Sequence, residues 1–341
     1  MCRGGGSGCS EGGNFHRVKD HQKAKARNFN TNDRPLAKFI DWSALQLVYT
    51  LGVRSVPKAK WKLEEALEFL NGPNFIPAAS DPAQIEFDGL RHFKFATPRP
   101  GEVEENNIVY GRFHRCAERW QERPVIMLLD GNPAIGYHTA FPWLARRLNR
   151  AGFIVATLVA AHHLQRRPRR PIEWNCLEFA QVMAQNVAEI RALTGWLLAE
   201  GCPSVGLVGF SFGGWLAGLT ACNDTRIAAA VLTVPAVRMR HTQPVIWRRV
   251  REVIIALRPA QEAMDTTRLN LILATPVIPK ENILLIEGIH DLFAGRQPIE
   301  DLWQPWGQPE LWRLPHGHLS GLCVPGLTSR VLDWLSPRLD G

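Results

Sequence analysis

The stretch VGLVGFSFGGWLAG, residues 205–218, places a single hydroxyl group, that of Ser211, inside an apolar and glycine-rich run. The residues before the serine predict a strand buried on both faces, and those after it predict a buried helix. Gly209 and Gly213 complete the pattern G-x-S-x-G at this strand-to-helix turn, where neighbouring backbone leaves no room for a Cβ atom. We therefore interpret Ser211 as a nucleophile at the carboxyl edge of a sheet. The alternative is an incidental serine in a glycine-rich packing turn.

Buried strands and helices alternate along most of the chain. Two segments of alternating polar and apolar residues, 91–98 and 106–116, predict antiparallel strands at a sheet edge. The order of elements predicts an α/β fold, with a mostly parallel central sheet and helices on both faces. Four further apolar runs predict central parallel strands: RPVIMLLDG (123–131), FIVATLVA (153–160), IAAAVLTVP (227–235) and NILLIEGIHD (282–291).

The chain divides into three predicted parts. Residues 1–35 are rich in glycine and charge, which predicts a disordered basic leader. Residues 36–83 contain two helical patterns and form a predicted N-terminal helical extension. Residues 84–341 form the predicted main domain, in which residues 237–281 separate two strands and predict a helical cap insertion.

Composition narrows the class of protein. The formal net charge is +8, and residues 1–35 supply half of it with seven Lys or Arg against three acidic residues. The remainder is mildly basic, so nucleic-acid binding is not indicated. Seven scattered cysteines without metal-ligand spacing favour reduced thiols and a cytoplasmic protein. No secretory signal is visible, and organelle targeting by the basic N-terminus is the alternative. The oligomeric state stays open.

A nucleophilic serine needs a base, and the base needs an acid that orients it. In the strand-to-helix architecture that the G-x-S-x-G pattern indicates, these follow in the order serine, acid, histidine. Asp291 lies just past a predicted strand after Ser211, at the edge where sites of parallel sheets are built, and is the predicted acid. Glu287, inside that strand, and Asp301, which opens a helix, are weaker candidates.

The base is expected in the segment LPHGHLSG, residues 314–321. His318 directly follows Gly317 after the last predicted strand and is favoured, while His316 is the alternative. The two histidines also suggest a metal site, but the one further ligand nearby in the sequence is His290, so we predict no metal and no cofactor.

Two backbone N–H groups are expected to stabilise a negatively charged oxygen formed during the reaction. One is that of Phe212, at the N-terminus of the helix after Ser211. The second is expected from the loop after VIMLLDG, where the N–H of Asn132 or of its neighbour is the candidate.

These residues together resemble the α/β-hydrolase superfamily over residues 84–337. The resemblance implies Ser211 as nucleophile, His318 as general base and then acid, and Asp291 as the residue that orients it. The segments AAHHLQRRPRRP and GHLS are more loosely similar to a poorly characterised α/β-hydrolase-domain-containing group with an N-terminal helical extension. Many esterases of the superfamily have a His-Gly motif where this chain has Asp130-Gly131, which leaves the geometry of the acyl pocket open.

Two basic clusters point to an anionic or amphiphilic ester. Arg166 and Arg167 follow a predicted strand at the site edge and are candidate anion ligands. The adjacent His162 and His163 are expected to be structural. Residues 245–258 predict a cap helix with a solvated basic face, or a lid that contacts an anionic membrane surface. Its apolar face holds Ile246, Val250, Val253, Ile254 and Leu257, and its basic face holds Arg248, Arg251 and Arg258.

The favoured function is a serine hydrolase that cleaves a carboxylic ester of a small or lipid-like molecule through an acyl-enzyme on Ser211. One alternative is a catalytically silent α/β-hydrolase-like binding or scaffold protein. Another is a peptidase, thioesterase or acyltransferase, because the same three residues serve all of these reactions.

Overall fold

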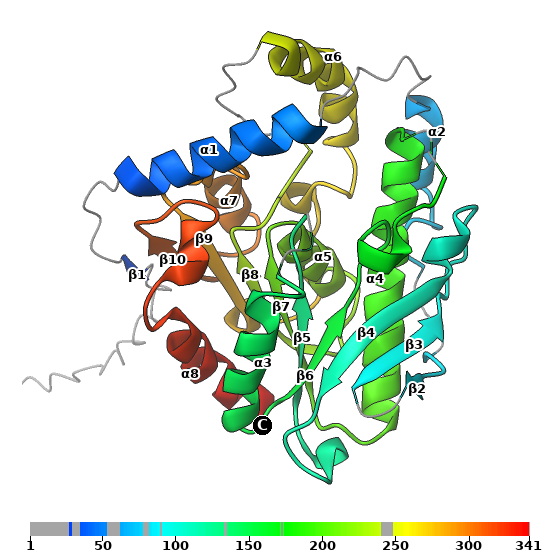
Figure 1. The fold of residues 1–341 in the computed structure, drawn as a ribbon, viewed down its shortest axis with the longest axis vertical. Coiled ribbons are helices and arrows are strands. Elements are labelled where there is room, and N and C mark those ends of the chain that lie inside the picture. Colours follow the sequence, from blue (N-terminus) through cyan, green and yellow to red (C-terminus); the bar gives the residue numbers. More distant parts are fainter. Residues whose placement is uncertain are drawn as a thin grey trace, which may run out of the picture.

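The computed structural model describes residues 27–28, 35–52, 62–77, 82–88, 91–132, 134, 136–170, 172, 174–239 and 248–340. One sheet of ten strands runs through this part of the chain, in the order β1-β10-β9-β8-β7-β5-β6-β4-β3-β2 (Figure 1). The strands are β1 (Arg27–Asn28), β2 (Glu86–Asp88), β3 (His92–Ala96), β4 (Ile108–His114), β5 (Val125–Leu129), β6 (Ile154–Leu158), β7 (Val205–Phe210), β8 (Ile227–Thr233), β9 (Ile283–Gly288) and β10 (Glu310–Leu314).

Neighbouring strands from β1 to β6 are parallel, and β6-β4, β4-β3 and β3-β2 are antiparallel. The predicted α/β fold, with its antiparallel strands at the edge, is confirmed. All residues of β5 and β6 are buried because helices cover both faces of the sheet. In β3 burial alternates, with Phe93 and Phe95 buried and His92, Lys94 and Ala96 exposed.

Helices lie on both faces of the sheet. The α-helices are α1 (Pro35–Gly52), α2 (Leu63–Asn71), α3 (Ala140–Arg150), α4 (Cys176–Ala199), α5 (Phe212–Ala221), α6 (Arg248–Met264), α7 (Arg296–Trp303) and α8 (Leu327–Leu339). Short 3-10 helices are η1 (Glu104–Asn106), η2 (Trp120–Glu122), η3 (Leu164–Arg166), η4 (Leu271–Leu273), η5 (Lys280–Asn282) and η6 (Ser320–Cys323).

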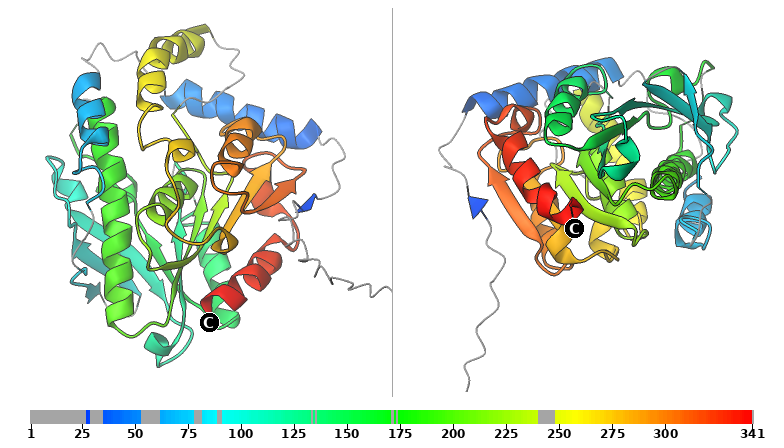
Figure 2. Two further views of the ribbon diagram at one scale, coloured as in Figure 1. Left: turned by 180° about the vertical axis from the view of Figure 1, so that it is seen from behind. Right: turned by 90° about the horizontal axis from the view of Figure 1, so that it is seen from below.

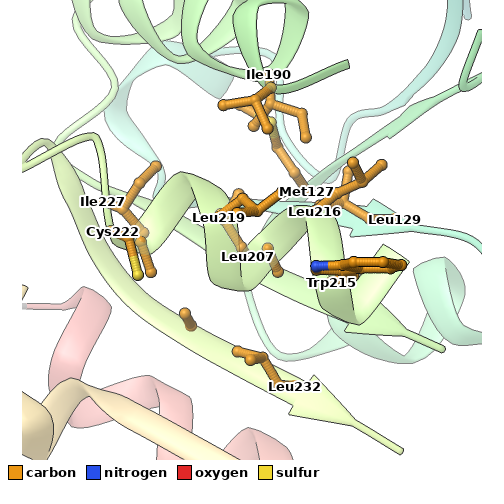
Figure 3. Packing of buried hydrophobic residues seen from close by; sticks show 14 of the residues in the cluster. Met127, Leu129, Ile190, Leu207, Trp215, Leu216, Leu219, Cys222, Ile227 and Leu232 are labelled. Atoms are coloured by element: carbon orange, nitrogen blue, oxygen red, sulfur yellow. The ribbon is translucent and has the colours of Figure 1, made fainter. Parts of the chain in front are cut away.

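The core consists of two clusters, one on each face of the sheet. Met127 and Leu129 of β5 point into the first, where α4 and α5 cover the sheet (Figure 3). Ile126 and Leu128 point into the second, where α3 and α8 cover it. Successive strand residues point to opposite faces, so one apolar strand supplies both clusters. The central strands are thereby fixed from both sides, and the loops at their ends have a rigid base.

The predicted N-terminal extension contributes two helices. Helix α2 lies beside α4 (Figure 1). It also packs against α6, and α1 contacts η6. From behind, α2 lies alongside α4, and α6 lies at the end of the molecule that also carries α1 (Figure 2). Two residues of the segment predicted to be disordered, Arg27–Asn28, instead pair with β10, whose outer edge offers free backbone groups. Residues 1–26 and 29–34 lie outside the described residues.

The segment between β8 and β9, where a cap insertion is predicted, contains α6, η4 and η5. Leu257 is half-buried and Arg258 is exposed, as expected for the apolar and basic faces. The other residues of the two predicted faces lie outside the described residues or side chains: Ile246, Arg248, Val250, Arg251, Val253 and Ile254.

Candidate active site

Ser211 occupies a constrained turn between β7 and α5. Its backbone angles are φ 54° and ψ −114°, a region that residues other than glycine rarely adopt. Backbone bonds hold this conformation, since Ser211 N donates to Thr233 O at 3.0 Å and Ser211 O accepts from Ala236 N at 3.1 Å. A Cβ atom on Gly209 would meet the backbone of Gly213 and its neighbour, which explains the glycines around the turn. In this strained conformation the hydroxyl of Ser211 projects from the turn, away from β7 and α5.

The structure brings Ser211, Asp291 and His318 together. His318 Nε2 lies 2.9 Å from Ser211 Oγ, and His318 Nδ1 lies 2.7 Å from Asp291 Oδ2. A carboxylate only accepts, so Nδ1 carries the proton toward Asp291 and Nε2 is free to accept the proton of the serine hydroxyl. The three residues follow β7, β9 and β10, whose carboxyl ends share one edge of the sheet.

The base and the acid are held rigidly in place. Ring centroids of Phe293 and Phe210 lie 4.9 Å and 5.2 Å from that of His318, and the side chain of His318 is only 5% exposed. The other carboxylate oxygen of Asp291, Oδ1, accepts from Phe293 N at 2.7 Å and Ala294 N at 3.0 Å. These bonds leave Oδ2 to face the imidazole, so both rings and bonds fix one orientation of the histidine.

The rival candidates occupy other positions. His316 accepts from His290 N at 3.1 Å through its backbone oxygen, whereas Ser211 Oγ is contacted by the ring of His318. Glu287 is fully buried beside Arg296 at 3.2 Å and Arg313 at 3.1 Å. Asp301 lies 3.3 Å from the guanidinium of Arg238. The geometry therefore selects His318 and Asp291 as the partners of Ser211.

The loop after β5 is shaped by Asp130. Its carboxylate accepts from Gly131 N at 2.8 Å and from Tyr137 N at 2.7 Å, which closes the loop on itself. Burial raises the pKa of the Asp130 carboxyl above its ordinary value, with these N–H groups acting in the opposite direction. The loop packs against Phe210 and Ser211 through Gly131. The Asp-Gly pair thus has a structural use here, in folding the loop that carries Asn132.

Asn132 and Phe212, the two predicted N–H donors, line one cavity of about 250 Å³. Its walls include the aromatic rings of Trp174 and Phe179, and Arg167 lies on its rim as an exposed side chain. The further lining residues are Ala134, Ala161, His162, His163, Leu164 and Val182. This volume lies just below the roughly 300–1,000 Å³ typical of ligand pockets, so the cavity fits a small group.

The two histidines at this cavity have structural partners. His162 Nε2 lies 3.1 Å from Glu178, and His163 Nδ1 lies 2.8 Å from the backbone oxygen of Ala161. The ring of His163 also stacks on Phe212, with centroids 5.8 Å apart. Burial lowers the pKa of His163, which favours its neutral form. The expected structural role of this pair agrees with these contacts.

The prediction that Arg166 binds an anionic ligand is wrong. Its side chain is 0% exposed, and its guanidinium donates to both carboxylate oxygens of Glu189, at 2.6 Å and 2.8 Å. It also donates to the backbone oxygens of Val159 and Asn106. Both terminal nitrogens of this guanidinium therefore bind acceptors inside the protein. Arg167 is the member of the predicted pair that faces the cavity.

One buried residue near the site was not predicted. Asp41 of α1 is 0% exposed, and its carboxylate accepts from the backbone N–H groups of His318, Leu319 and Leu292. A sequence signal exists, because Ala37, Asp41 and Leu45 recur at intervals of four and share the buried face of the helix. An acidic residue in an apolar stripe indicates a buried polar partner.

Comparisons with known proteins agree with this architecture. The family model described as alpha/beta hydrolase domain containing 18 matches residues 92–250. Acetyl xylan esterase 1 from Thermoanaerobacterium sp. JW/SL YS485 has a TM-score of 0.56 at 11% identity, covering 82% of this chain and 94% of that one. The esterase Pf2001 of Pyrococcus furiosus has a TM-score of 0.51 at 14% identity, covering 76% and 100%. The chain has the fold of these esterases, and the family match supports the resemblance to the α/β-hydrolase superfamily that its sequence indicated.

Within the superfamily, the matched segment contains Ser211 but ends before Asp291 and His318. An uncharacterized protein of Mycobacterium tuberculosis is 31% identical over 147 residues, which cover 40% of this chain. The match spans 33% of the length of that relative.

In the described residues of this chain, no helix is long and apolar enough to cross a membrane.

Proposed function

We propose that this chain is a serine hydrolase that cleaves a carboxylic ester through an acyl-enzyme on Ser211. The observation that carries the proposal is the continuous series of contacts from Asp291 through His318 to Ser211, at 2.7 Å and 2.9 Å. A hydroxyl is a weak nucleophile at neutral pH unless an adjacent base takes its proton. The series supplies that base, and the buried carboxylate supports the positive charge that the base acquires.

The first half of the reaction forms the acyl-enzyme. As Ser211 Oγ attacks the ester carbonyl carbon, its proton moves to His318 Nε2, and the carbonyl oxygen becomes negatively charged. We assign the backbone N–H groups of Phe212 and Asn132 to that oxygen. The tetrahedral intermediate then collapses, the bond to the alcohol oxygen breaks, and His318 Nε2–H protonates the leaving alcohol.

The second half releases the acid. A water molecule gives its proton to His318 Nε2 while its oxygen attacks the acyl carbon, and a second tetrahedral intermediate forms at the same donors. Collapse of this intermediate breaks the bond to Ser211 Oγ, which recovers its proton from His318. Asp291 stays ionised throughout and stabilises the imidazolium that forms in each half.

The surroundings of the site support an amphiphilic ester with one anionic end. The cavity beside Asn132 and Phe212 has aromatic walls and carries the guanidinium of Arg167 on its rim. A planar guanidinium suits a carboxylate or phosphate group. At the same end of the molecule, α1 and α6 expose large apolar side chains, Phe39 at 61% and Ile255 at 55%. Such surfaces favour an ester with an apolar portion.

Labelling with a fluorophosphonate probe tests the proposal, because the probe reacts with a serine hydroxyl that is activated by a base. Wild-type protein is expected to be labelled, and Ser211→Ala and His318→Ala are expected to remain unlabelled while folded by circular dichroism. Ser336→Ala is the matched control, since that hydroxyl donates to Leu332 O within α8. Labelling of Ser211→Ala would contradict the assignment.

Hydrolysis assays then separate the classes of reaction that the same residues serve. Labelled wild-type protein is expected to hydrolyse short p-nitrophenyl esters faster than the matching anilides or thioesters. Folded wild-type protein that neither takes the probe nor hydrolyses any of these compounds would instead support a silent binding or scaffold protein.

A further inference from the structure

Asp41 joins the two loops that carry the acid and the base. Its Oδ2 accepts from His318 N at 2.5 Å and from Leu292 N at 3.2 Å, and its Oδ1 accepts from Leu319 N at 3.1 Å. Leu292 directly follows Asp291, so each loop gives Asp41 an N–H group at or beside its functional residue. One carboxylate therefore fixes the distance between the two loops.

The surroundings of Asp41 fit it closely. A Cβ atom on Gly317 would have all three of its nearest neighbours in the Asp41 carboxyl group, the closest at 2.5 Å. The residue before His318 is thus small where the carboxylate has to approach the backbone. Burial raises the pKa of Asp41, and the nearby charge of Asp291 adds to this, while the three N–H groups act in the opposite direction.

A buried carboxylate beside a second carboxylate is costly to stability unless hydrogen bonds compensate for it. The Asp41 side chain occupies a position in the helix where its neighbours on the same face, Ala37 and Leu45, are apolar. A leucine there would fill the space without the electrostatic cost, but it would leave three backbone N–H groups without an acceptor.

We propose that Asp41 is a positioning residue, which places the imidazole of His318 against Ser211 by holding the loops of the acid and the base together. The N-terminal helix α1 is therefore part of the active site, although it contributes no group to the reaction. This inference rests on the proposed function of Ser211, Asp291 and His318.

Steady-state hydrolysis of a p-nitrophenyl ester by Asp41→Ala and Asp41→Asn tests the role. In Asp41→Ala kcat is expected to fall roughly 10²-fold, the effect of displacing a reacting group by about 1 Å. KM is expected to stay within about twofold of wild type, because Asp41 is not among the residues lining the cavity. Asp41→Asn keeps the shape of the side chain and one acceptor oxygen, so its kcat is expected to lie between those of wild type and Asp41→Ala. If Asp41→Ala does not fold, Asp41→Asn tests the proposal in its place.

Gly317→Ala approaches the same contact from the other side. Its new methyl group is expected to displace the Asp41 carboxylate, so kcat falls with KM retained. In an Asp41→Ala background the carboxylate is absent, and adding Gly317→Ala is expected to cost little more. This non-additivity is the sign of a shared contact. Fully additive losses in the double variant would overturn the proposal.

Asp224→Asn is the matched control for a purely structural effect. Asp224 is also buried, and its carboxylate accepts from Arg226 at 2.6 Å, before the start of β8 and thus at the opposite edge of the sheet. The variant is expected to unfold at a lower urea concentration with kcat unchanged. The positioning role is overturned if Asp41→Ala keeps the kcat of wild type. It is also overturned if Asp224→Asn, at an equal loss of unfolding free energy, lowers kcat as much as Asp41→Ala does.

Amide hydrogen exchange tests the contact without relying on activity. Residues 289–294 and 316–321 are expected to exchange faster in Asp41→Asn than in wild type or Asp224→Asn. Unchanged exchange in both segments would overturn the positioning role even in an active enzyme. Faster exchange in a protein that hydrolyses no ester and takes no fluorophosphonate probe would support the role of Asp41, while the proposed function would be wrong.

Discussion

The two sides of the candidate site differ in how firmly they are built. On the reacting side, Asp291 and His318 are almost fully buried, and aromatic rings and backbone N–H groups fix them. On the cavity side, Asn132 and Arg167 are exposed and Trp174 is 42% exposed. The comparison teaches that the proposed reaction would depend on a few inflexible contacts, whereas the proposed choice of substrate would depend on residues that can be replaced with little effect on the fold.

The largest effect is expected from the reacting side. In Asp291→Asn the amide no longer selects the productive tautomer of His318, and kcat is expected to fall about 10⁴-fold. Ester hydrolysis under saturating substrate measures this loss. Asp301→Asn is the control, because its carboxylate contacts Arg238 and not the site. Wild-type kcat in Asp291→Asn, with a loss in Asp301→Asn, would show that the acid was assigned wrongly.

A buried ion pair behind the cavity provides the next test. Glu189→Gln leaves the guanidinium of Arg166 buried without its carboxylate, and is expected to lower the free energy of unfolding by about 3–5 kcal/mol. Urea denaturation measures this change. Glu122→Gln is the matched control, because its contact with Arg119 at 3.5 Å is exposed and such pairs contribute about 0–1 kcal/mol. Equal losses of unfolding free energy in Glu189→Gln and Glu122→Gln would mean that the buried ion pair contributes no more to stability than the exposed one.

The stability of the fold is expected to depend on pH through Glu287. Burial raises its pKa from 4.5 to about 7, while Arg296 and Arg313 act in the opposite direction. Between pH 4.5 and about 7 the folded protein therefore keeps a proton on Glu287 that the unfolded chain releases. The contribution of this protonated carboxyl to the free energy of unfolding is complete below pH 4.5. It declines as the pH rises toward 7, by up to about 3 kcal/mol.

Urea unfolding at pH 5 and pH 8 measures this decline. Glu287→Gln is expected to show a smaller difference between the two pH values than wild type, because the amide does not titrate. Glu281→Gln, which replaces an exposed carboxylate, is expected to behave like wild type. An unchanged difference in Glu287→Gln would show that other groups cause the pH dependence.

The smallest effect is expected on the cavity side. Arg167→Ala is expected to raise KM about tenfold for an ester with a carboxylate at one end, since a hydrogen bond to a charged group contributes about 1.5–3 kcal/mol. KM for an uncharged ester and kcat for both are expected to stay unchanged. Arg170→Ala is the matched control, an exposed arginine of the same loop that does not line the cavity. A rise in KM for both esters would contradict a charge-specific contact.

The sequence predicted those parts of the site that sit at the ends of buried strands. Ser211, Asp291 and His318 each follow a strand whose apolar run is visible in the sequence, and parallel strands end at one edge. The fold was predictable for the same reason, because continuous apolar runs such as β5 are distinct from the alternating pattern of β3.

Partners from distant segments could not be predicted in this way. Arg166 and Arg167 are adjacent and chemically identical, and only the packing of α4 decides that Arg166 meets Glu189 while Arg167 faces the cavity. Asp41 meets His318 only after α1 has reached the edge of the sheet. Local periodicity shows which face of an element is apolar but does not show what that face meets.

The bond between Asp41 and His318 also has a consequence for biosynthesis. The two residues are 277 positions apart, and the second of them lies beyond the last strand of the sheet. A ribosome has therefore made nearly all of this sequence before the contact can form, and contacts of such separation form late and slowly. The rise of kcat to its full value in a refolding chain would accordingly report that this contact has formed.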